Sequence, residues 1–336
     1  MIHPAIGEEG QRALAAARVL LIGCGALGTH IADALVRAGV GFLRVVDRDF
    51  VELHNLQRQV LFDEGDSERG LPKALAAAGR LRRINSAVAI EPVVDDVNAG
   101  NIAALIGDID LIIDGTDNFE TRYLLNDAAV RAGKPWVYGG VLATYGMTMT
   151  IVPGDTPCLR CVFPDPPPPG SAPTCDTAGV LGPAVATIAA IEASEALKLL
   201  VGARDAINRA LLAVDIWRLS FDRLEVPRKP TCPACGDGPR AYPFLDFAAT
   251  SRTTTLCGRN AVQIAVTASP PPALALPELA ERLRPAGAVR FNEHLLRFRP
   301  TDGAQELVIF PNSRAIVHGT DDPALARSLY ARYIGI

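Results

Sequence analysis

The chain has 336 residues, of which 49% are hydrophobic, and its formal net charge is −4. This length predicts one large α/β domain and a smaller one, with enough apolar side chains for a buried core. A mildly acidic chain without a basic run argues against nucleic acid as the main partner. No uncharged apolar stretch reaches about 18 residues, so no membrane helix is expected, and the N-terminus lacks a secretory pattern.

The first part of the chain alternates between strand and helix patterns. Strands are predicted over residues 18–22, 42–46, 89–94, 110–113 and 136–138. Helices are predicted over residues 26–38, 75–84 and 121–132. Such alternation indicates a Rossmann-like, mostly parallel sheet with helices on both faces. Alternating polarity over residues 147–152 then predicts an antiparallel extension of this sheet.

A long helix is expected over residues 182–200, followed by strands over 211–214 and 217–226. The character of the sequence changes after residue 238, where short β patterns and two helical segments follow. We therefore predict a large α/β domain over residues 1–238 and a small α+β domain over 241–336. The sequence does not show the role of the second domain.

Three glycines follow the first predicted strand and begin the first predicted helix: Gly23, Gly25 and Gly28. Glycines allow a tight turn and let backbone N–H groups approach phosphates, while the helix N-terminus adds a partial positive charge. Asp47 follows the second strand, where a ribose-binding acid belongs. These features alone favour a dinucleotide-dependent oxidoreductase.

The polar residues that follow Asp47 favour ATP instead. Asn55, Arg58 and Lys73 together could neutralise a triphosphate, and Asp117 could carry Mg²⁺ just beyond a strand end. A nicotinamide cofactor has a pyrophosphate but no terminal phosphate for these groups to bind. The alternative is that Arg58 and Lys73 are solvated surface charges.

Four of the seven cysteines form two Cys-x-x-Cys pairs, Cys158 with Cys161 and Cys232 with Cys235. Two such pairs, separated by about seventy residues, predict one tetrahedral zinc ion that joins distant segments. The alternative is that each pair is an incidental pair of buried thiols. An odd number of cysteines with metal spacing favours the reducing cytoplasm over a disulfide framework.

In this order, the motifs resemble those of the MoeB/ThiF/HesA adenylyltransferases, bacterial relatives of ubiquitin-activating enzymes. The resemblance covers roughly residues 7–238. It is carried by the glycine loop, the two cysteine pairs and a set of short motifs: Asp47-x-Asp49, Asn55-Leu-Gln-Arg58-Gln59, Pro72-Lys73, Asp114-Gly-Thr-Asp117-Asn118 and the segment Thr174-Cys175 to Gly182-Pro183.

The resemblance implies an enzyme that uses ATP and Mg²⁺ to adenylate the C-terminal Gly-Gly of a ubiquitin-fold sulfur-carrier protein of the MoaD/ThiS type. Pyrophosphate leaves, and the carrier goes on to a thiocarboxylate in molybdopterin, thiamine or related sulfur-transfer pathways. Residues 1–238 would then be an adenylation domain with a four-cysteine zinc site. The implied nucleotide-binding residues are Gly23, Gly25, Gly28, Asp47, Asp49, Asn55, Arg58, Gln59, Lys73, Asp117 and Asn118.

Within that set, the resemblance assigns Asp47 to the ribose, Asn55, Arg58 and Lys73 to the phosphates, and Asp117 to Mg²⁺. In this family the arginine that matches Arg58 reaches in from the partner subunit, which implies a homodimer. Cys175 matches the candidate nucleophilic cysteine. The C-terminal region has no cysteine in a rhodanese-type loop, so a separate sulfur donor is expected.

Two alternatives to this enzyme are an NAD-dependent Rossmann oxidoreductase and a non-catalytic scaffold that binds nucleotide and a ubiquitin-fold partner. The scaffold is motivated by the start of the chain, Met1-Ile2-His3-Pro4. Family members usually have an Arg-Tyr-x-Arg-Gln-like segment there, which contributes to the nucleotide site.

Overall fold

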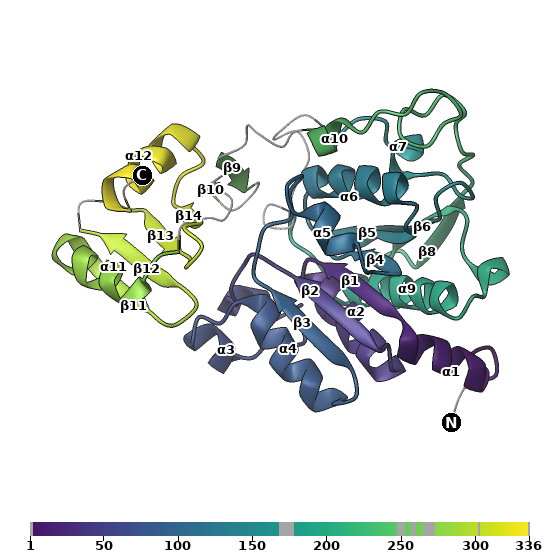
Figure 1. Cartoon of the computed structure of the whole chain (residues 1–336), viewed down its shortest axis with the longest axis horizontal. Coiled ribbons are helices and arrows are strands. Elements are labelled where there is room, and N and C mark those ends of the chain that lie inside the picture. The colour runs from purple at the N-terminus through teal and green to yellow at the C-terminus, as the bar shows by residue number, and fades with distance from the viewer. Residues whose placement is uncertain are drawn as a thin grey trace. The chain divides into compact units, whose positions relative to one another are not determined.

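The structure is a computed structural model that describes residues 3–167, 178–246, 253–256, 260–264, 273–301 and 303–334. The chain forms two compact units, Met1–Asp246 and Phe247–Ile336 (Figure 1). Among the described residues, no helix is long and apolar enough to span a membrane.

An eight-stranded sheet forms the centre of the first unit, in the order β3-β2-β1-β4-β5-β6-β7-β8. The strands β3, β2, β1, β4 and β5 pair in parallel, and β6, β7 and β8 continue the sheet in antiparallel fashion. Their bounds are β1 Arg18–Ile22, β2 Phe42–Val46, β3 Ala89–Val93, β4 Leu111–Asp114, β5 Trp136–Leu142, β6 Tyr145–Ile151, β7 Leu211–Asp215 and β8 Ser220–Leu224.

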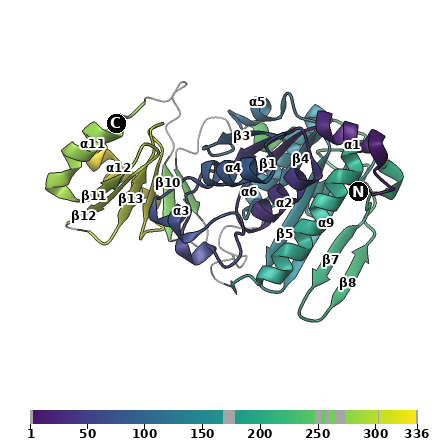
Figure 2. The same ribbon diagram turned by 90° about the horizontal axis from the view of Figure 1, so that it is seen from below.

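Helices cover both faces of this sheet, as Figures 1 and 2 show. One face carries α1 Gly7–Ala16, α2 Ala26–Ala38, α4 Lys73–Ile84 and α9 Gly182–Leu200. The other carries α5 Ile102–Ile106, α6 Phe119–Ala132, α7 Leu159–Val162 and α10 Pro243–Asp246. The short elements η1 Leu53–Asn55, α3 Glu64–Glu68 and η2 Arg204–Ala206 lie in connections. Because both faces are covered, the inner strands are almost wholly apolar, as in β1.

Helix α9 packs closely on β5 and β6 because two glycines leave room for its side chains. A Cβ at Gly139 in β5 would overlap the carboxyl group of Glu192, and one at Gly146 in β6 would overlap the side chain of Ile188. Glu192 and Ile188 lie one turn apart on α9, so the glycines match successive turns of the helix.

The second unit contains an antiparallel six-stranded sheet in the order β11-β12-β13-β14-β10-β9. Its strands are β9 Thr253–Leu256, β10 Ala261–Ile264, β11 Gly287–Phe291, β12 Leu296–Pro300, β13 Glu306–Ile309 and β14 Ala315–His318. The helices α11 Leu276–Leu283 and α12 Pro323–Tyr333, with η3 Arg284–Ala286, complete it. Alternate strand residues such as Phe298 and Val317 pack with Leu279 and Tyr330 of the helices in one apolar core.

These two units confirm the predicted fold class, a mostly parallel α/β sheet with an antiparallel extension and a separate small α+β unit. The predicted strands 18–22 and 42–46 and the predicted helices 26–38 and 182–200 coincide with β1, β2, α2 and α9. The strand predicted over 217–226 is observed only as β8, Ser220–Leu224, because residues 217–219 form a turn in which Leu219 has a φ of 55°.

Candidate functional site

The glycine loop joins β1 to α2, and packing requires two of its three glycines. A Cβ at Gly23 would lie 2.6 Å from the carbonyl oxygen of Gly115, and one at Gly28 would overlap the carbonyl oxygen of Gly23. Gly25, the N-cap of α2, differs, because the nearest atom to a Cβ there is Gln59 Nε2 at 3.8 Å. The space beside Gly25 can therefore admit an anionic group at the helix N-terminus.

Asp47 connects this loop to the end of β2 through hydrogen bonds. Its Oδ2 accepts a hydrogen bond from the backbone N–H of Cys24 at 2.6 Å, and its Oδ1 accepts one from the N–H of Asp49 at 2.7 Å. Burial raises the pKa of Asp47, while the positive charge of Lys73 acts in the opposite direction. The carboxylate stands beside the glycine loop, where Rossmann-type folds bind a ribose.

Lys73 is the first residue of α4, and it is only 1% exposed. Its Nζ donates to Asp49 Oδ2 at 3.2 Å, and its backbone N–H donates to the carbonyl oxygen of Asp49 at 2.9 Å. Lys73 is therefore not a solvated surface charge. Its buried ammonium group also acts electrostatically on Asp47, so a positive charge lies next to the glycine loop.

Asn55 is the last residue of η1, and Arg58 and Gln59 lie in the loop that follows it. Arg58 Nη2 donates to Asn55 Oδ1 at 3.0 Å, and its Nη1 donates to the carbonyl oxygen of His54 at 3.4 Å. Gln59 is 3% exposed, and its Oε1 has no hydrogen-bond partner in the described part of the chain. Within one chain, Arg58 thus bonds to its own loop, while the side-chain amide nitrogen of Gln59, a hydrogen-bond donor, lies close to Gly25.

Asp117 lies just beyond β4 and is exposed. The backbone that leads to it contacts the glycine loop, because Gly115 donates its N–H to Ile22 O at 2.7 Å. Asn118 is the N-cap of α6, where its Oδ1 accepts from the N–H of Thr121 at 2.8 Å. Asp117 therefore stands at the carboxyl end of the strand next to β1, and Asn118 uses its side-chain oxygen for helix capping.

Arg122, which no sequence motif indicated, stabilises this edge of the sheet through several hydrogen bonds. Its Nε donates to Asp114 Oδ2 at 3.1 Å, and its Nη2 donates to the carbonyl oxygens of Thr116 and Gly139 at 2.7 and 2.9 Å. Burial raises the pKa of Asp114, and the charge of Arg122 opposes that shift. The sequence does place an arginine one turn into the helix that follows β4, and that position could have indicated a partner for Asp114.

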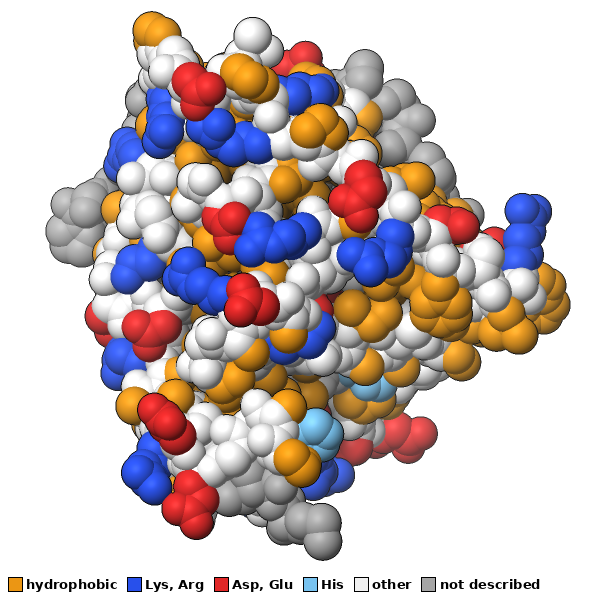
Figure 3. Space-filling view, turned by 90° about the vertical axis from the view of Figure 1, so that its right-hand side faces the viewer, with side chains coloured by type: hydrophobic (Ala, Val, Ile, Leu, Met, Phe, Trp, Pro, Cys, Tyr) orange, Lys and Arg blue, Asp and Glu red, His pale blue; other side chains and the backbone are white. Residues whose placement is uncertain are grey.

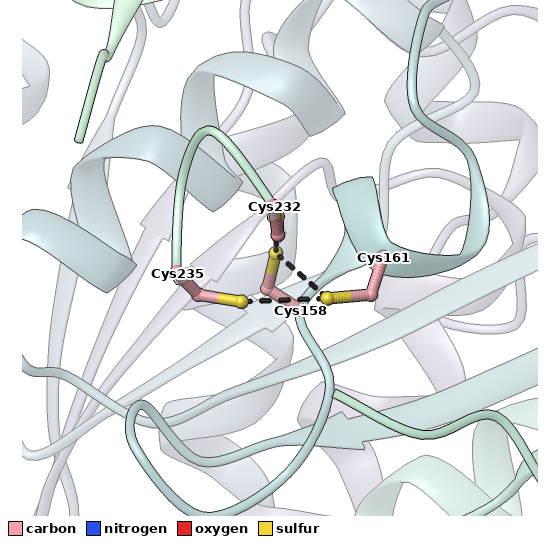
Figure 4. A group of neighbouring side chains, drawn as sticks. All are labelled: Cys158, Cys161, Cys232 and Cys235. Atoms are coloured by element: carbon pink, nitrogen blue, oxygen red, sulfur yellow. Dashed lines mark hydrogen bonds between the residues drawn. The ribbon is translucent and has the colours of Figure 1, made fainter. Parts of the chain in front are cut away.

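The four cysteines of the two Cys-x-x-Cys pairs meet in one cluster (Figure 4). All are buried, and their sulfur atoms lie within 4.8 Å of one another. The separations are 4.0 Å for Cys158–Cys161, 3.6 Å for Cys158–Cys232 and 3.4 Å for Cys161–Cys235. A tetrahedral zinc with Zn–S bonds of about 2.3 Å requires S–S separations of about 3.8 Å. The cluster therefore fits a zinc ion.

Local geometry shapes each half of this cluster. Cys158 is the N-cap of the short helix α7, so Cys161 lies on the first turn. A Cβ at Gly236 would lie 2.5 Å from the carbonyl oxygen of Cys232, so a glycine closes the second turn. The backbone N–H of Lys229 donates to Cys161 Sγ at 3.5 Å, as is typical of amides around metal-bound thiolates.

Cys175, the candidate nucleophile, lies outside the described residues. Cys24 lies in the glycine loop and is fully buried, and burial raises the pKa of its thiol. A protonated thiol is a poor nucleophile, so Cys24 is a packing residue at neutral pH.

A hairpin of β7 and β8 projects from the first unit (Figure 2). Its tip and outer strand carry four exposed large apolar side chains: Trp217 at 77%, Leu219 at 77%, Phe221 at 56% and Leu224 at 48%. Hydrophobic side chains gather on this projection, which lies at the right of Figure 3. Residues 221–224 are all exposed, so β8 adds little to the core of this unit.

Comparison with known proteins gives matches along the whole chain. The ThiF family matches residues 1–234. The Bacillus subtilis (strain 168) protein named sulfur carrier protein ThiS adenylyltransferase is 45% identical over 333 residues, which are 98% of this chain and 96% of that protein. The sulfur carrier protein adenylyltransferase of Thermus thermophilus is 42% identical over 74% of this chain and 93% of its own length.

Solved structures show the same fold. The crystal structure of E. coli MccB with ATP matches with a TM-score of 0.59 and 23% identity, and it covers 68% of this chain and 69% of that chain. At this identity the likeness concerns the fold alone.

Proposed function

The chain belongs to the ThiF family, and from this membership we infer that it is an ATP-dependent adenylyltransferase that activates a sulfur carrier protein. The observation that carries this conclusion is the match of 98% of the chain to a relative named for that activity. These relatives give no support to an NAD-dependent oxidoreductase or to a non-catalytic scaffold.

In this reaction a carboxylate oxygen of the carrier's C-terminal glycine attacks the α-phosphorus of ATP. The new O–P bond replaces the bond to the bridging oxygen of pyrophosphate, which leaves with the electron pair. The carrier becomes an acyl-adenylate, a much better acyl donor than a carboxylate. This step needs in-line alignment and charge neutralisation more than a general base.

We propose that the nucleotide lies along the glycine loop. The open space beside Gly25 and the N-terminus of α2 would receive phosphate oxygens. Lys73 would add a positive charge, and the side-chain amides of Asn55 and Gln59 would add N–H donors, of which Gln59 Nε2 is the side-chain atom nearest Gly25. Asp47 already accepts two backbone N–H groups, and its remaining lone pairs would accept the ribose hydroxyls.

We propose Asp117 as the Mg²⁺ ligand. Its carboxylate is exposed at the carboxyl end of β4, and hard oxygen donors suit this ion. When bound, Mg²⁺ would neutralise charge on the phosphates. Arg122 would hold the preceding carbonyl of Thr116 and so keep the Asp117 loop in place.

A homodimer with Arg58 shared between subunits also belongs to this proposal. Within its own chain, Arg58 bonds to its own loop through Asn55 and His54. That loop also exposes Leu53 at 61% and Val60 at 50%, which is unusual for large apolar residues. A partner subunit that covers them would also receive Arg58.

We propose that the carrier is a ubiquitin-fold protein of the ThiS type, in line with the relative that matches 98% of this chain. It ends in Gly-Gly, and it docks on the apolar β7–β8 hairpin with its tail directed to the nucleotide. The sulfur atom comes from a separate donor. The four-cysteine cluster holds a structural zinc ion, and because such thiolates persist in a reducing compartment, we place the protein in the cytoplasm.

The test is carrier-dependent exchange of labelled pyrophosphate into ATP, run across Gly-Gly-ended ubiquitin-fold proteins from the same host. A ThiS-type carrier should support exchange, and the same carrier without its terminal glycine should not. If the purified dimer with full zinc exchanges no pyrophosphate with any such carrier, the proposed function is wrong.

A further inference from the structure

Glu192 lies in the middle of α9 and is fully buried, at 0% exposure. Neither of its carboxyl oxygens has a hydrogen-bond partner among the residues that the structure describes. The carboxyl group rests on the backbone of Gly139 in β5, in the space that a Cβ would take. An ionised carboxylate without a partner in such a place is strongly unfavourable, so the surroundings favour the neutral acid.

The charged groups that act on this carboxyl are Asp114 of β4 and Arg122 of α6. Burial raises the pKa of Glu192 well above its usual value, Asp114 acts in the same direction, and Arg122 opposes both. Burial likewise raises the pKa of Tyr138 on β5, and the charge of Arg122 opposes that shift.

The other elements packed on α9 bring no further charge to Glu192. The buried residues of α1 and α2 include no ionisable group. Glu195, one turn further along α9, has its own partners in Thr150 and Lys198. The charged residues of η2, Arg204 and Asp205, follow the C-terminal end of the helix and are exposed.

A second buried polar group without a partner among the described residues lies on β6. Gly139 pairs directly with Thr148 across β5 and β6, and directly opposed residues in an antiparallel pair project from the same face. Thr148 is 1% exposed, and its Oγ1 also lacks a hydrogen-bond partner among the described residues. Because neither group has a partner within hydrogen-bond distance in the described part of the chain, one water molecule would link them, accepting from the O–H of the neutral carboxyl group and donating to Thr148 Oγ1.

Gly139 also connects Glu192 to the proposed adenylation site. Its carbonyl oxygen accepts from Arg122 Nη2 at 2.9 Å, and the same nitrogen donates to Thr116 O at 2.7 Å. Thr116 immediately precedes Asp117. A shift of Arg122 toward a new negative charge at Glu192 would therefore move the backbone that carries Asp117.

We propose that Glu192 works as a neutral carboxylic acid and is a positioning residue for the nucleotide site, holding Gly139 and Arg122 in the arrangement that fixes the Asp117 loop. The effect of Glu192 on catalysis rests on the proposed function, whereas the protonation state of Glu192 does not depend on it.

The sign of the pH effect follows from proton counting. In the unfolded chain Glu192 loses its proton in the ordinary pH range of a glutamic acid, whereas in the folded chain it keeps the proton to higher pH. Between these two pH ranges, the folded chain therefore binds one more proton than the unfolded chain. Stability from this group is therefore largest at low pH and is lost as the pH rises through that interval. Glu192→Gln mimics the neutral acid in shape and hydrogen bonding and removes this loss.

The experiment compares the wild-type protein with Glu192→Gln and Glu192→Leu, and with Glu225→Gln as a control, because the Glu225 side chain is 77% exposed. Thermal unfolding is measured from pH 5 to pH 9 without substrates, and carrier-dependent pyrophosphate exchange is measured over the same range. Glu192→Gln should unfold at nearly the wild-type temperature at pH 5 and at a higher temperature than wild type at pH 9.

In the exchange assay, wild-type activity should fall on the alkaline side, by about tenfold per pH unit beyond half-ionisation of Glu192. Glu192→Gln should keep its activity there, while Glu192→Leu should lose activity at every pH. If Glu192→Gln and wild type show the same pH dependence in unfolding and in exchange, the inference is overturned. If the wild type exchanges nothing at any pH while the unfolding difference persists, only the proposed function and the catalytic consequence of Glu192 fail.

Discussion

The Nζ atom of Lys73 lies 3.2 Å from Oδ2 of Asp49, and both residues are almost completely buried beside the glycine loop. The pair joins the start of α4 to the end of β2, so the ammonium group is held before any nucleotide arrives. A charge that is already in position needs little rearrangement during the reaction, and this is the main way in which such sites stabilise transferring phosphoryl groups.

We predict that Lys73→Met lowers carrier-dependent pyrophosphate exchange by about 100-fold or more, because one charge on the phosphates is lost. It should also lower the free energy of unfolding by about 1–3 kcal/mol, since Asp49 loses a buried partner. Exchange kinetics and urea unfolding measure the two effects. Arg83→Met, an exposed change on the same helix, is the matched control. Normal exchange in Lys73→Met would contradict the proposed role.

Arg58→Ala and Asp117→Ala should each abolish exchange as homodimers, and mixing them should restore it. If Arg58 acts on the partner's nucleotide, each mixed dimer has one intact site, and random assembly of the symmetric dimer restores about a quarter of wild-type activity. If Arg58 acts within its own chain, every site in the mixture carries a defect, and no activity returns. Exchange in remixed subunits, with oligomeric state measured by light scattering, distinguishes these outcomes.

Asp117→Asn should reduce exchange by about 100-fold while ATP still binds, because the amide lacks the charge that holds Mg²⁺. In the wild type, Mg²⁺ should strengthen stabilisation by ATP in thermal unfolding, and this Mg²⁺ dependence should vanish in the variant. Arg131→Gln, an exposed change on α6, is the control and should leave the Mg²⁺ dependence intact. Exchange that persists unchanged in Asp117→Asn would show that the Mg²⁺ ligand lies elsewhere.

Metal analysis should give one zinc ion per chain in the wild type and none in Cys232→Ser. Because metal binding is coupled to folding, the serine variant should lose about 4 kcal/mol or more of unfolding free energy. Cys24→Ala is the control, since it removes a buried cysteine outside the cluster and should keep the zinc. A metal-free protein with wild-type stability would be incompatible with a structural zinc ion.

Asp108 provides a test at acid pH. Hydrogen bonds from Arg44 and Arg18 lower the pKa of this carboxyl to about 2. A lowered pKa in the fold means that the stabilisation is present above the ordinary range of an aspartic acid and is lost as the pH falls toward 2. Thermal unfolding of Asp108→Asn should therefore differ from wild type at pH 5 and converge with it near pH 2. Asp222→Asn on the exposed strand β8 should show no such convergence.

Local patterns were sufficient for most of the first unit. The spacing of Leu27, Ile31 and Leu35 predicts helix α2, and Gly39, whose φ is 86°, ends it in the left-handed conformation. The shorter elements α1, α5 and β11 were not predicted, because segments of five to ten residues are too short to show a clear periodicity.

The sequence by itself determined the order of strands and helices, the turn at the glycine loop and the metal-type spacing of the four cysteines, because periodicity and spacing are properties of neighbouring residues. Only the tertiary structure decided which charges are buried and paired. The strand order β3-β2-β1-β4-β5 brings Asp114 under the glycine loop, joins Lys73 to Asp49, and sets Arg122 and Glu192 on opposite sides of Gly139. These partners are far apart in sequence, and an isolated lysine or glutamate has the same local pattern whether it faces solvent or a core.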